Sequence, residues 1–234
     1  MDRVAVFVDA GYLFAEGARV LSGRKVARSD VLLDHSIAVS ELARFAGCKS
    51  GMPLLRIYWY DATANRPTRS QVALAEQADV KLRLGRVDAD GRQKGVDALI
   101  ARDLVTLARN RAMADCVLLS GDDDLRVAVS EVQQLGVRVH LVGVCPAPRT
   151  QSRLLRQEAD STSEWGADVL RVFMHCRPRS TGRGDGVEKG IDLARPGIRS
   201  WRAARTTGSV RDIARQVARQ VLIREFAVRT GRYP

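Results

Sequence analysis

The sequence contains no long apolar run and no recognisable export signal. None of its hydrophobic stretches approaches the ~20 residues that a membrane-spanning helix requires. The N-terminal Met1-Asp2-Arg3 leads directly into a short apolar run, not into a basic region followed by a long hydrophobic segment and a cleavage site. The apolar fraction of 45% suits a folded protein. We therefore expect a cytoplasmic protein without a membrane partner.

Cysteine and histidine are scarce, which argues against a disulfide framework and against a zinc site. The four cysteines lack paired spacing, and the three histidines are scattered, so structural roles are expected for both. They are Cys48, Cys116, Cys145 and Cys176, and His35, His140 and His175. The chain also lacks a P-loop, a dinucleotide-binding glycine fingerprint and the Gly-x-Ser-x-Gly elbow of serine hydrolases. Its chemistry must therefore come from other side chains.

Positive charge is in excess and is concentrated towards the C-terminus. The net charge is +11. Residues 151–234 contain 17 basic and 9 acidic residues, whereas residues 1–150 contain 21 and 18. Excess positive charge attracts polyanions, although it does not by itself identify a nucleic-acid-binding protein.

The first two thirds of the sequence alternate short apolar runs with amphipathic stretches. Strands are predicted at residues 4–8, 54–60, 80–87, 116–119 and 137–142, with an edge strand at 169–173. Helices are predicted at residues 11–20, from 29 or 30 to 46, from 68 or 70 to 78, and at 96–110, 124–135 and 152–160. Strands separated by helices predict an α/β fold with a mainly parallel sheet.

The composition changes after about residue 176. Residues 177–208 are rich in Gly, Pro, Ser and Arg, which predicts a linker between a first domain at 1–176 and a tail at 209–234. The tail has the pattern of a basic amphipathic helix, with Arg211, Arg215 and Arg219 at four-residue spacing. This stripe could extend an RNA-binding surface or keep a dimerising helix soluble.

Four aspartates occupy places where a parallel sheet would bring them together. Asp9 ends the first strand, Asp97 opens a helix, and Asp122 and Asp124 follow the strand at 116–119. In such sheets the ligand site lies beyond the carboxyl ends of the strands. Oxygen ligands without Cys or His suit Mg²⁺ or Mn²⁺, so we predict a metal site that activates water. Each aspartate taken alone could instead cap a helix.

Two further residues are predicted to support this site. Ser120 could orient a carboxylate through a hydrogen bond. Asp103 lies on the apolar face of its helix, where a carboxylate requires a partner. It could bind loop backbone beneath the site or approach the acidic cluster itself.

Together these segments resemble the NYN family, the LabA-like bacterial branch of the PIN-like nucleases. The matching segments lie within residues 3–160: Val6–Leu13, then Lys94-Gly95-Val96-Asp97 with Asp103, Leu119–Leu125, and the stretch from Ser152 to Asp160. The resemblance implies a PIN-like, Rossmann-like three-layer fold with a mainly parallel sheet, to which the basic helical extension is added. It also implies that Asp9, Asp97, Asp122 and Asp124 bind Mg²⁺ or Mn²⁺ and catalyse hydrolysis of RNA phosphodiesters. Tyr12 stands where many relatives have asparagine.

Three functions are compatible with these features. The first is a metal-dependent endoribonuclease, the second a catalytically weak or inactive RNA-binding or regulatory module, and the third a phosphohydrolase for nucleotides or small phosphate esters. RNA contacts are predicted at Tyr12, Lys94, Arg24 and Lys25, with Arg66 and Arg69 as further candidates. The resemblance makes a homodimer possible, since PIN-like enzymes often work as dimers, but the sequence identifies no interface.

Overall fold

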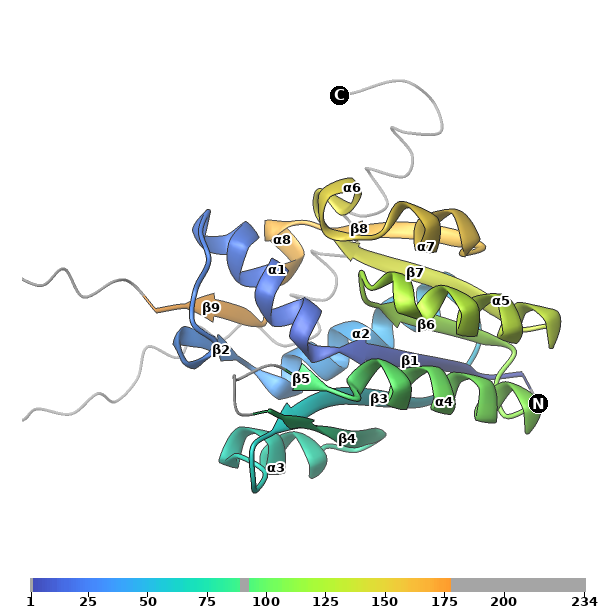
Figure 1. Cartoon of the computed structure of the whole chain (residues 1–234), viewed down its shortest axis with the longest axis horizontal. Coiled ribbons are helices and arrows are strands. Elements are labelled where there is room, and N and C mark those ends of the chain that lie inside the picture. Colours follow the sequence, from blue (N-terminus) through green and yellow to red (C-terminus); the bar gives the residue numbers. More distant parts are fainter. Residues whose placement is uncertain (1, 89–92, 178–234) are drawn as a thin grey trace, which may run out of the picture. The chain divides into compact units, whose positions relative to one another are not determined.

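A computed structural model describes residues 2–88 and 93–177, in which a seven-stranded sheet forms the centre (Figure 1). Its strand order is β5–β4–β3–β1–β6–β7–β8. All neighbouring pairs are parallel except β4 and β5. The strands are β1 (Val4–Asp9), β3 (Leu54–Thr63), β4 (Val80–Val87), β5 (Gln93–Lys94), β6 (Asp115–Leu119), β7 (Arg138–Val144) and β8 (Ser161–Trp165). The predicted α/β fold with a mainly parallel sheet is confirmed.

Helices cover both faces of this sheet and complete three layers. One face carries α1 (Ala10–Ser22), α2 (His35–Ser50), α3 (Arg69–Ala75) and α8 (Ala167–Leu170). The other carries α4 (Val96–Arg109), α5 (Arg126–Gln134) and α7 (Arg153–Glu158), while the short α6 (Ala147–Thr150) follows β7. Figure 1 shows α4 and α5 in front of the sheet and α2 behind it. No helix in the described part of the chain is long and apolar enough to pass through a bilayer.

Strand β1 shows why the chain folds in this way. Val4, Val6 and Val8 belong to the core beneath α1 and α2, and Ala5 and Phe7 belong to the core beneath α4 and α5. Successive side chains of a strand point to opposite faces, so a continuous apolar run is buried on both sides. This run therefore predicts a central strand.

The strand order reverses beside β1. The chain first adds β3, β4 and β5 on one side of β1, and then returns to add β6, β7 and β8 on the other. A crevice forms at such a reversal, outside the carboxyl ends of the two central strands. Here those ends are Asp9 of β1 and Leu119 of β6.

Two predictions were wrong because they missed one long-range pairing. The predicted helix from residue 29 or 30 is preceded by a 3-10 turn, η1 (Arg28–Asp30), and by β2 (Val31–Leu33), so that α2 begins only after the capping residue Asp34. The edge strand predicted at 169–173 is instead the end of α8 and a turn, followed by β9 (Met174–Cys176). Strands β2 and β9 pair antiparallel across more than 140 residues of sequence. The predicted linker and basic helical tail lie almost entirely outside the described residues.

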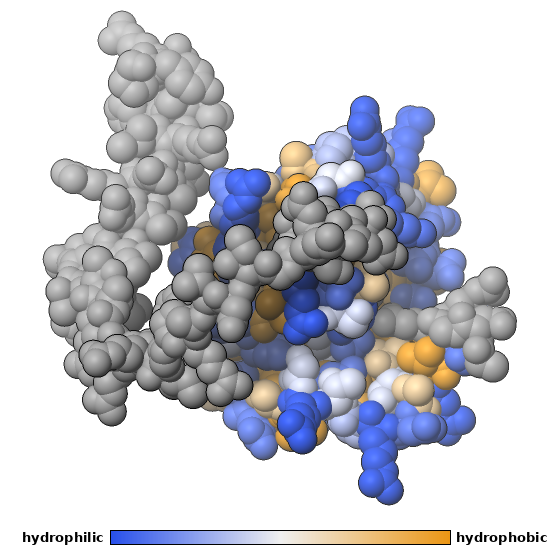
Figure 2. Space-filling model, turned by 90° about the vertical axis from the view of Figure 1, so that its left-hand side faces the viewer, coloured by the Kyte–Doolittle hydropathy of each residue, from blue (hydrophilic) through white to orange (hydrophobic). Residues whose placement is uncertain are grey.

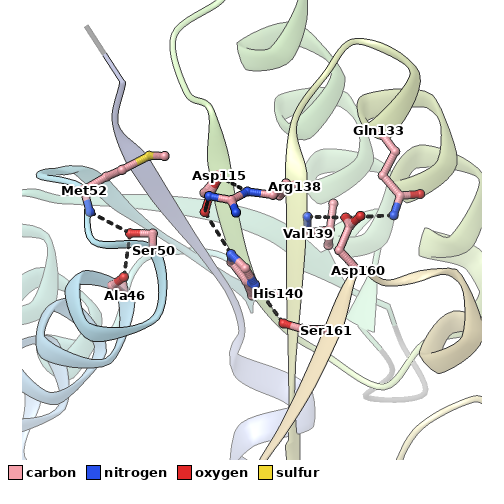
Figure 3. Close-up of polar contacts among 10 residues, drawn as sticks. All are labelled: Ala46, Ser50, Met52, Asp115, Gln133, Arg138, Val139, His140, Asp160 and Ser161. Carbon is pink, nitrogen blue, oxygen red and sulfur yellow. Dashed lines mark hydrogen bonds and ion pairs between the residues drawn. The ribbon is translucent and has the colours of Figure 1, made fainter.

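A polar network fixes the amino end of the sheet (Figure 3). The buried carboxylate of Asp115, 1% exposed, accepts two hydrogen bonds of 2.9 Å from Arg138 and lies 2.9 Å from Nε2 of His140. His140 Nδ1 in turn lies 2.8 Å from the Ser161 hydroxyl. These contacts join β6, β7 and β8 in register, and they give His140 a structural role.

We expect Asp115→Asn to lower the free energy of unfolding by about 2 kcal/mol, because charge-assisted hydrogen bonds of a buried carboxylate are weakened. Urea denaturation would measure the loss. Glu131→Gln serves as the control, since Glu131 pairs with Arg109 at the surface and such a pair contributes less than about 1 kcal/mol. Equal losses in the two variants would contradict a stabilising network at Asp115.

Candidate functional site

Asp9 ends β1 and is held from two directions. Its Oδ1 accepts a hydrogen bond of 3.1 Å from the Tyr12 backbone N–H, which caps α1. Its Oδ2 accepts a bond of 3.0 Å from the hydroxyl of Ser120, which is fully buried just beyond β6. The carboxylate is thereby fixed between the two central strands, with only 8% of the residue exposed. The structure thus uses Asp9 as a helix cap and also places it at the strand reversal.

In the loop after β6, the side chains of Asp122 and Asp123 have different hydrogen-bond partners. Asp122 caps the 3-10 turn η2 (Asp123–Leu125), with Oδ1 accepting a bond of 3.0 Å from the Asp124 N–H. Asp123 accepts a bond of 2.5 Å from the Ser152 hydroxyl, which itself caps α7. Asp123 is therefore directed towards α7.

Gly121 is required in this loop because of a close approach. A side-chain Cβ here would collide with the Thr150 carbonyl oxygen and would lie 2.6 Å from the Tyr12 ring. The glycine allows the backbone to pack against Tyr12 and so determines where Asp122 begins.

Asp97 reaches the same region from α4. It lies in the first turn of that helix, directly after Gly95 and Val96, and is half-buried. Burial raises the pKa of Asp97, and the charges of Asp122 and Asp124 raise it further. Burial also raises the pKa of Asp9, with contributions from the charges of Asp97 and Asp122, against the hydrogen bonds from Tyr12 and Ser120. Asp9 is thus within electrostatic reach of Asp97 and Asp122, and Asp97 is within reach of Asp122 and Asp124. We name these four aspartates the acidic cluster.

The raised pKa of Asp9, caused mainly by burial and in part by the neighbouring carboxylates, predicts how stability depends on pH. The pKa of Asp9 is raised in the folded state, so its ionised form destabilises the fold at neutral pH, and this penalty disappears as the pH falls through the folded and then the unfolded pKa. Asn caps a helix about as well as Asp. We therefore expect Asp9→Asn to raise the melting temperature at neutral pH in EDTA, with a difference that shrinks towards acid pH.

Circular-dichroism melts over a pH series would test this expectation. Asp34→Asn is the matched control, because Asp34 caps α2 through the same kind of bond, to Ile37 N–H, outside the acidic cluster. A neutral-pH melting temperature for Asp9→Asn below that of the unchanged protein would contradict a destabilising effect of the ionised, buried Asp9 carboxylate.

Tyr12 has its hydroxyl engaged inside the protein. The hydroxyl accepts a bond of 2.9 Å from the Val144 N–H and lies 2.9 Å from Oγ1 of Thr150, which donates to the Val144 carbonyl. The proton of Tyr12 is consequently directed to Thr150. A hydrogen bond from Tyr12 to an RNA phosphate, which the sequence suggested, would require that bond to break.

Asp103 lies apart from the acidic cluster. It is buried on α4 and accepts bonds from the Tyr60 hydroxyl (3.1 Å) and from Nε of Arg83 (3.0 Å). Its carboxylate thus ties α4 to β3 and β4. These contacts differ from both predicted roles of Asp103, which were binding to loop backbone and an approach to the acidic cluster.

The predicted basic contacts lie at different distances from the acidic cluster. Lys94 is exposed in β5, three residues before Asp97. Arg24 and Lys25 are exposed beyond the far end of α1, a 13-residue helix and hence roughly 20 Å from Asp9. Lys94 is therefore the better placed of these side chains for a phosphate at the cluster.

The sequence reading missed an ion pair beside this edge. Arg28 of η1 donates to Asp61 of β3 at 2.6 Å, and Asp61 also accepts a bond of 2.9 Å from Gln71. Asp61 stands near the carboxyl end of its strand, which is the same signal that identified Asp9. Arg28 had no local signal, because its position depends on the pairing of β2 with β9.

Comparisons with known proteins agree with this architecture. A family model described as the NYN domain matches residues 3–165. An uncharacterized protein, y4oD of Sinorhizobium fredii, is 54% identical over 107 residues, which are 46% of this chain and 50% of the relative, so the chain matches about half of that protein's length. The crystal structure of VPA0982, a protein of unknown function from Vibrio parahaemolyticus RIMD 2210633, covers 71% of this chain and 94% of its own, with a TM-score of 0.50 and 22% identity. That likeness concerns the fold alone.

Proposed function

Because the chain belongs to the NYN domain family of PIN-like nucleases, we propose that it is a metal-dependent endoribonuclease. The supporting observation is the acidic cluster: carboxylates from β1, α4 and the loop after β6 lie at the strand reversal, where the charges of their neighbours help to raise the pKa values of Asp9 and Asp97. Keeping these charges together lowers the stability of the fold, whereas a divalent cation at this place would relieve the repulsion. Asp9, Asp97, Asp122 and Asp124 are the proposed catalytic residues.

The donor set fits Mg²⁺ or Mn²⁺. All four side chains offer carboxylate oxygen, the ligand that these hard cations prefer. Across residues 2–88 and 93–177, no three His, Cys, Asp or Glu side chains already converge on one ion position. Mg²⁺ keeps several of its waters and is commonly held through one or two carboxylates together with substrate phosphates, so it does not need such a cage. When bound, such an ion lowers the pKa of a water and neutralises phosphate charge.

The side chains around the cluster would divide the remaining tasks. Ser120 and the Tyr12 N–H hold Asp9 in one orientation, which leaves it little freedom to turn away from a ligand. Asp122 uses Oδ1 for its cap, so that its second oxygen is the one to engage a ligand. Lys94 would attract the phosphodiester to this edge. Raised pKa values at Asp9 and Asp97 imply that protons compete with the metal, so activity should fall at acid pH.

One observation favours a second function, a catalytically weak or inactive RNA-binding module. The backbone of Tyr12 is bonded to Asp9, but the Tyr12 hydroxyl is bonded to Thr150 and Val144 and is not available to a ligand of the acidic cluster. A polar side chain that assists the reaction from this position would therefore be missing.

A cleavage assay separates the two functions. Purified protein is incubated with labelled single-stranded RNA and Mn²⁺ or Mg²⁺, with EDTA as the control. We expect cleavage only with the metal. Salt-sensitive RNA binding without cleavage would favour the binding module, and hydrolysis of small phosphate esters in place of RNA would favour a different phosphohydrolase.

A further inference from the structure

A cavity of about 760 Å³ opens near the carboxyl end of β1, because its lining includes Asp61, which directly follows Tyr60, the partner of Asp9 in the sheet. It is lined by the carboxyl-terminal part of β3, by η1 and β2, and by α3 with the loop before it. Figure 2 looks towards the side of the molecule where β1 and β3 end, and hydrophobic side chains there show between hydrophilic ones. The volume lies within the range of about 300–1,000 Å³ that is typical of small-molecule sites.

One wall of the cavity is built around the guanidinium of Arg28. This group lies 3.7 Å from the centroid of the Phe14 ring and donates to Asp61. Its side chain is still 42% exposed. Burial lowers the pKa of Arg28, and the charges of Asp61 and Asp9 oppose this shift. Arg28 thus lines the cavity and is also within electrostatic reach of Asp9.

The charges of the cavity favour an anion with a flat, partly apolar body. Asp61 is 2% exposed and is satisfied by Arg28 and Gln71, so it presents no free negative charge. Asp61 neutralises Arg28, so the exposed Arg66 gives the lining its net positive charge. Burial lowers the pKa of His35, against the charge of Asp34, so its ring, 2.9 Å from the Ser70 hydroxyl, is a neutral hydrogen-bonding group. Planar guanidinium and aromatic groups are the surfaces on which unstacked RNA bases pack.

We propose that this cavity binds one nucleotide of a single-stranded RNA whose adjacent phosphate lies at the acidic cluster. The base packs against the Arg28–Phe14 pair, and Arg66 contacts the backbone of the strand. This inference rests on the proposed function and gives it a substrate class, unpaired RNA, because a base within a duplex cannot enter a cavity.

Ser70→Trp tests the cavity by filling it. Ser70 and Ala73 are both exposed on α3, but only Ser70 lines the cavity, so Ala73→Trp is the matched control. Binding of a fluorescent single-stranded RNA is measured by anisotropy in EDTA, where metal-dependent cleavage does not occur. We expect Ser70→Trp to weaken binding about tenfold, since stacking of one base contributes about 1–3 kcal/mol and 1.4 kcal/mol is tenfold. Ala73→Trp should bind like the unchanged protein.

The charge is tested by Arg66→Gln against Arg56→Gln. Arg66 lines the cavity, whereas Arg56 is exposed near the amino end of β3 and lies outside the cavity. Loss of one phosphate contact should reduce the slope of log affinity against log salt by about 0.7 for a single strand. We expect this change for Arg66→Gln only.

Three outcomes would overturn the inference. They are unchanged RNA affinity in Ser70→Trp, equal losses in Ser70→Trp and Ala73→Trp, and tight binding of free nucleoside monophosphates without binding of RNA. Cleavage by the unchanged protein reports separately on the proposed function. If the unchanged protein and Ser70→Trp cleave RNA equally well, the cavity has no part in cleavage, but the proposed ribonuclease function is unaffected. If the protein does not cleave RNA, but Ser70→Trp still weakens RNA binding, the proposed ribonuclease function is wrong and the RNA-binding cavity is supported.

Discussion

Asp122→Asn is expected to reduce RNA cleavage by about 10²–10³-fold, the size of effect seen when one group that stabilises transition-state charge is removed. Asp122 belongs to the acidic cluster, and its charge acts on both Asp9 and Asp97. Asparagine can still accept the hydrogen bond from the Asp124 N–H and so maintain the local turn. The substitution removes the charge with little change of shape.

The neighbouring residue provides a close control. Asp123→Asn makes the same chemical change one residue along the chain, but Asp123 is exposed and bonded to Ser152. We expect its cleavage rate to stay within about twofold of the unchanged protein, as for a surface substitution away from the site. Single-turnover rates at saturating protein, with melting temperatures for both variants, would make the comparison. Equal rates for Asp122→Asn and the unchanged protein would exclude the acidic cluster as the catalytic centre.

Gly121→Ala is expected to impair both folding and cleavage. The added methyl group collides with the Thr150 carbonyl oxygen and with the Tyr12 ring, and neither has room to move freely, because the Tyr12 hydroxyl is bonded to Val144. Overpacking of this kind costs about 1–3 kcal/mol. The loop must shift to relieve it, and a displacement of about 1 Å in a catalytic group can cost about 10²-fold in rate.

The opposite result is expected for Gly47→Ala. Gly47 lies within α2, and a Cβ there meets nothing within 4 Å. Replacing a helical glycine by alanine stabilises by about 0.5–1 kcal/mol. Urea denaturation of both variants should therefore give changes of opposite sign. Similar changes in the two proteins would show that the loop at Gly121 adapts to a side chain.

Local sequence patterns were sufficient to predict those strands and site residues whose positions follow from their immediate neighbours in the sequence. The run Val4–Val8 predicted a central strand because its period and length suit burial on both faces. Asp9 and Asp122 were found because each follows such a strand, and Asp97 because it opens a helix. Parallel topology then predicted that these residues meet, without any knowledge of distances.

Residues whose roles depend on distant partners were not accessible in this way. The position of Arg28 follows from the pairing of β2 with β9, which no local pattern reveals. Asp103 was identified as a buried carboxylate that needs a partner, but its partners, Tyr60 and Arg83, are 43 and 20 residues away. Tyr12 likewise finds its partners Val144 and Thr150 only through tertiary structure, so its hydroxyl could not be assigned from sequence.

The network around Asp115 (Figure 3) lies at the amino end of the sheet, where β6, β7 and β8 begin, whereas the acidic cluster lies near the carboxyl ends of β1 and β6. The fold thereby separates the residues that keep β6, β7 and β8 aligned from those that would meet a substrate. Substitutions at the carboxyl edge can change what is bound or cleaved without loosening the opposite edge, so the two ends of the sheet are free to diverge independently. This division is one physical reason why a single scaffold can host different activities in different descendants.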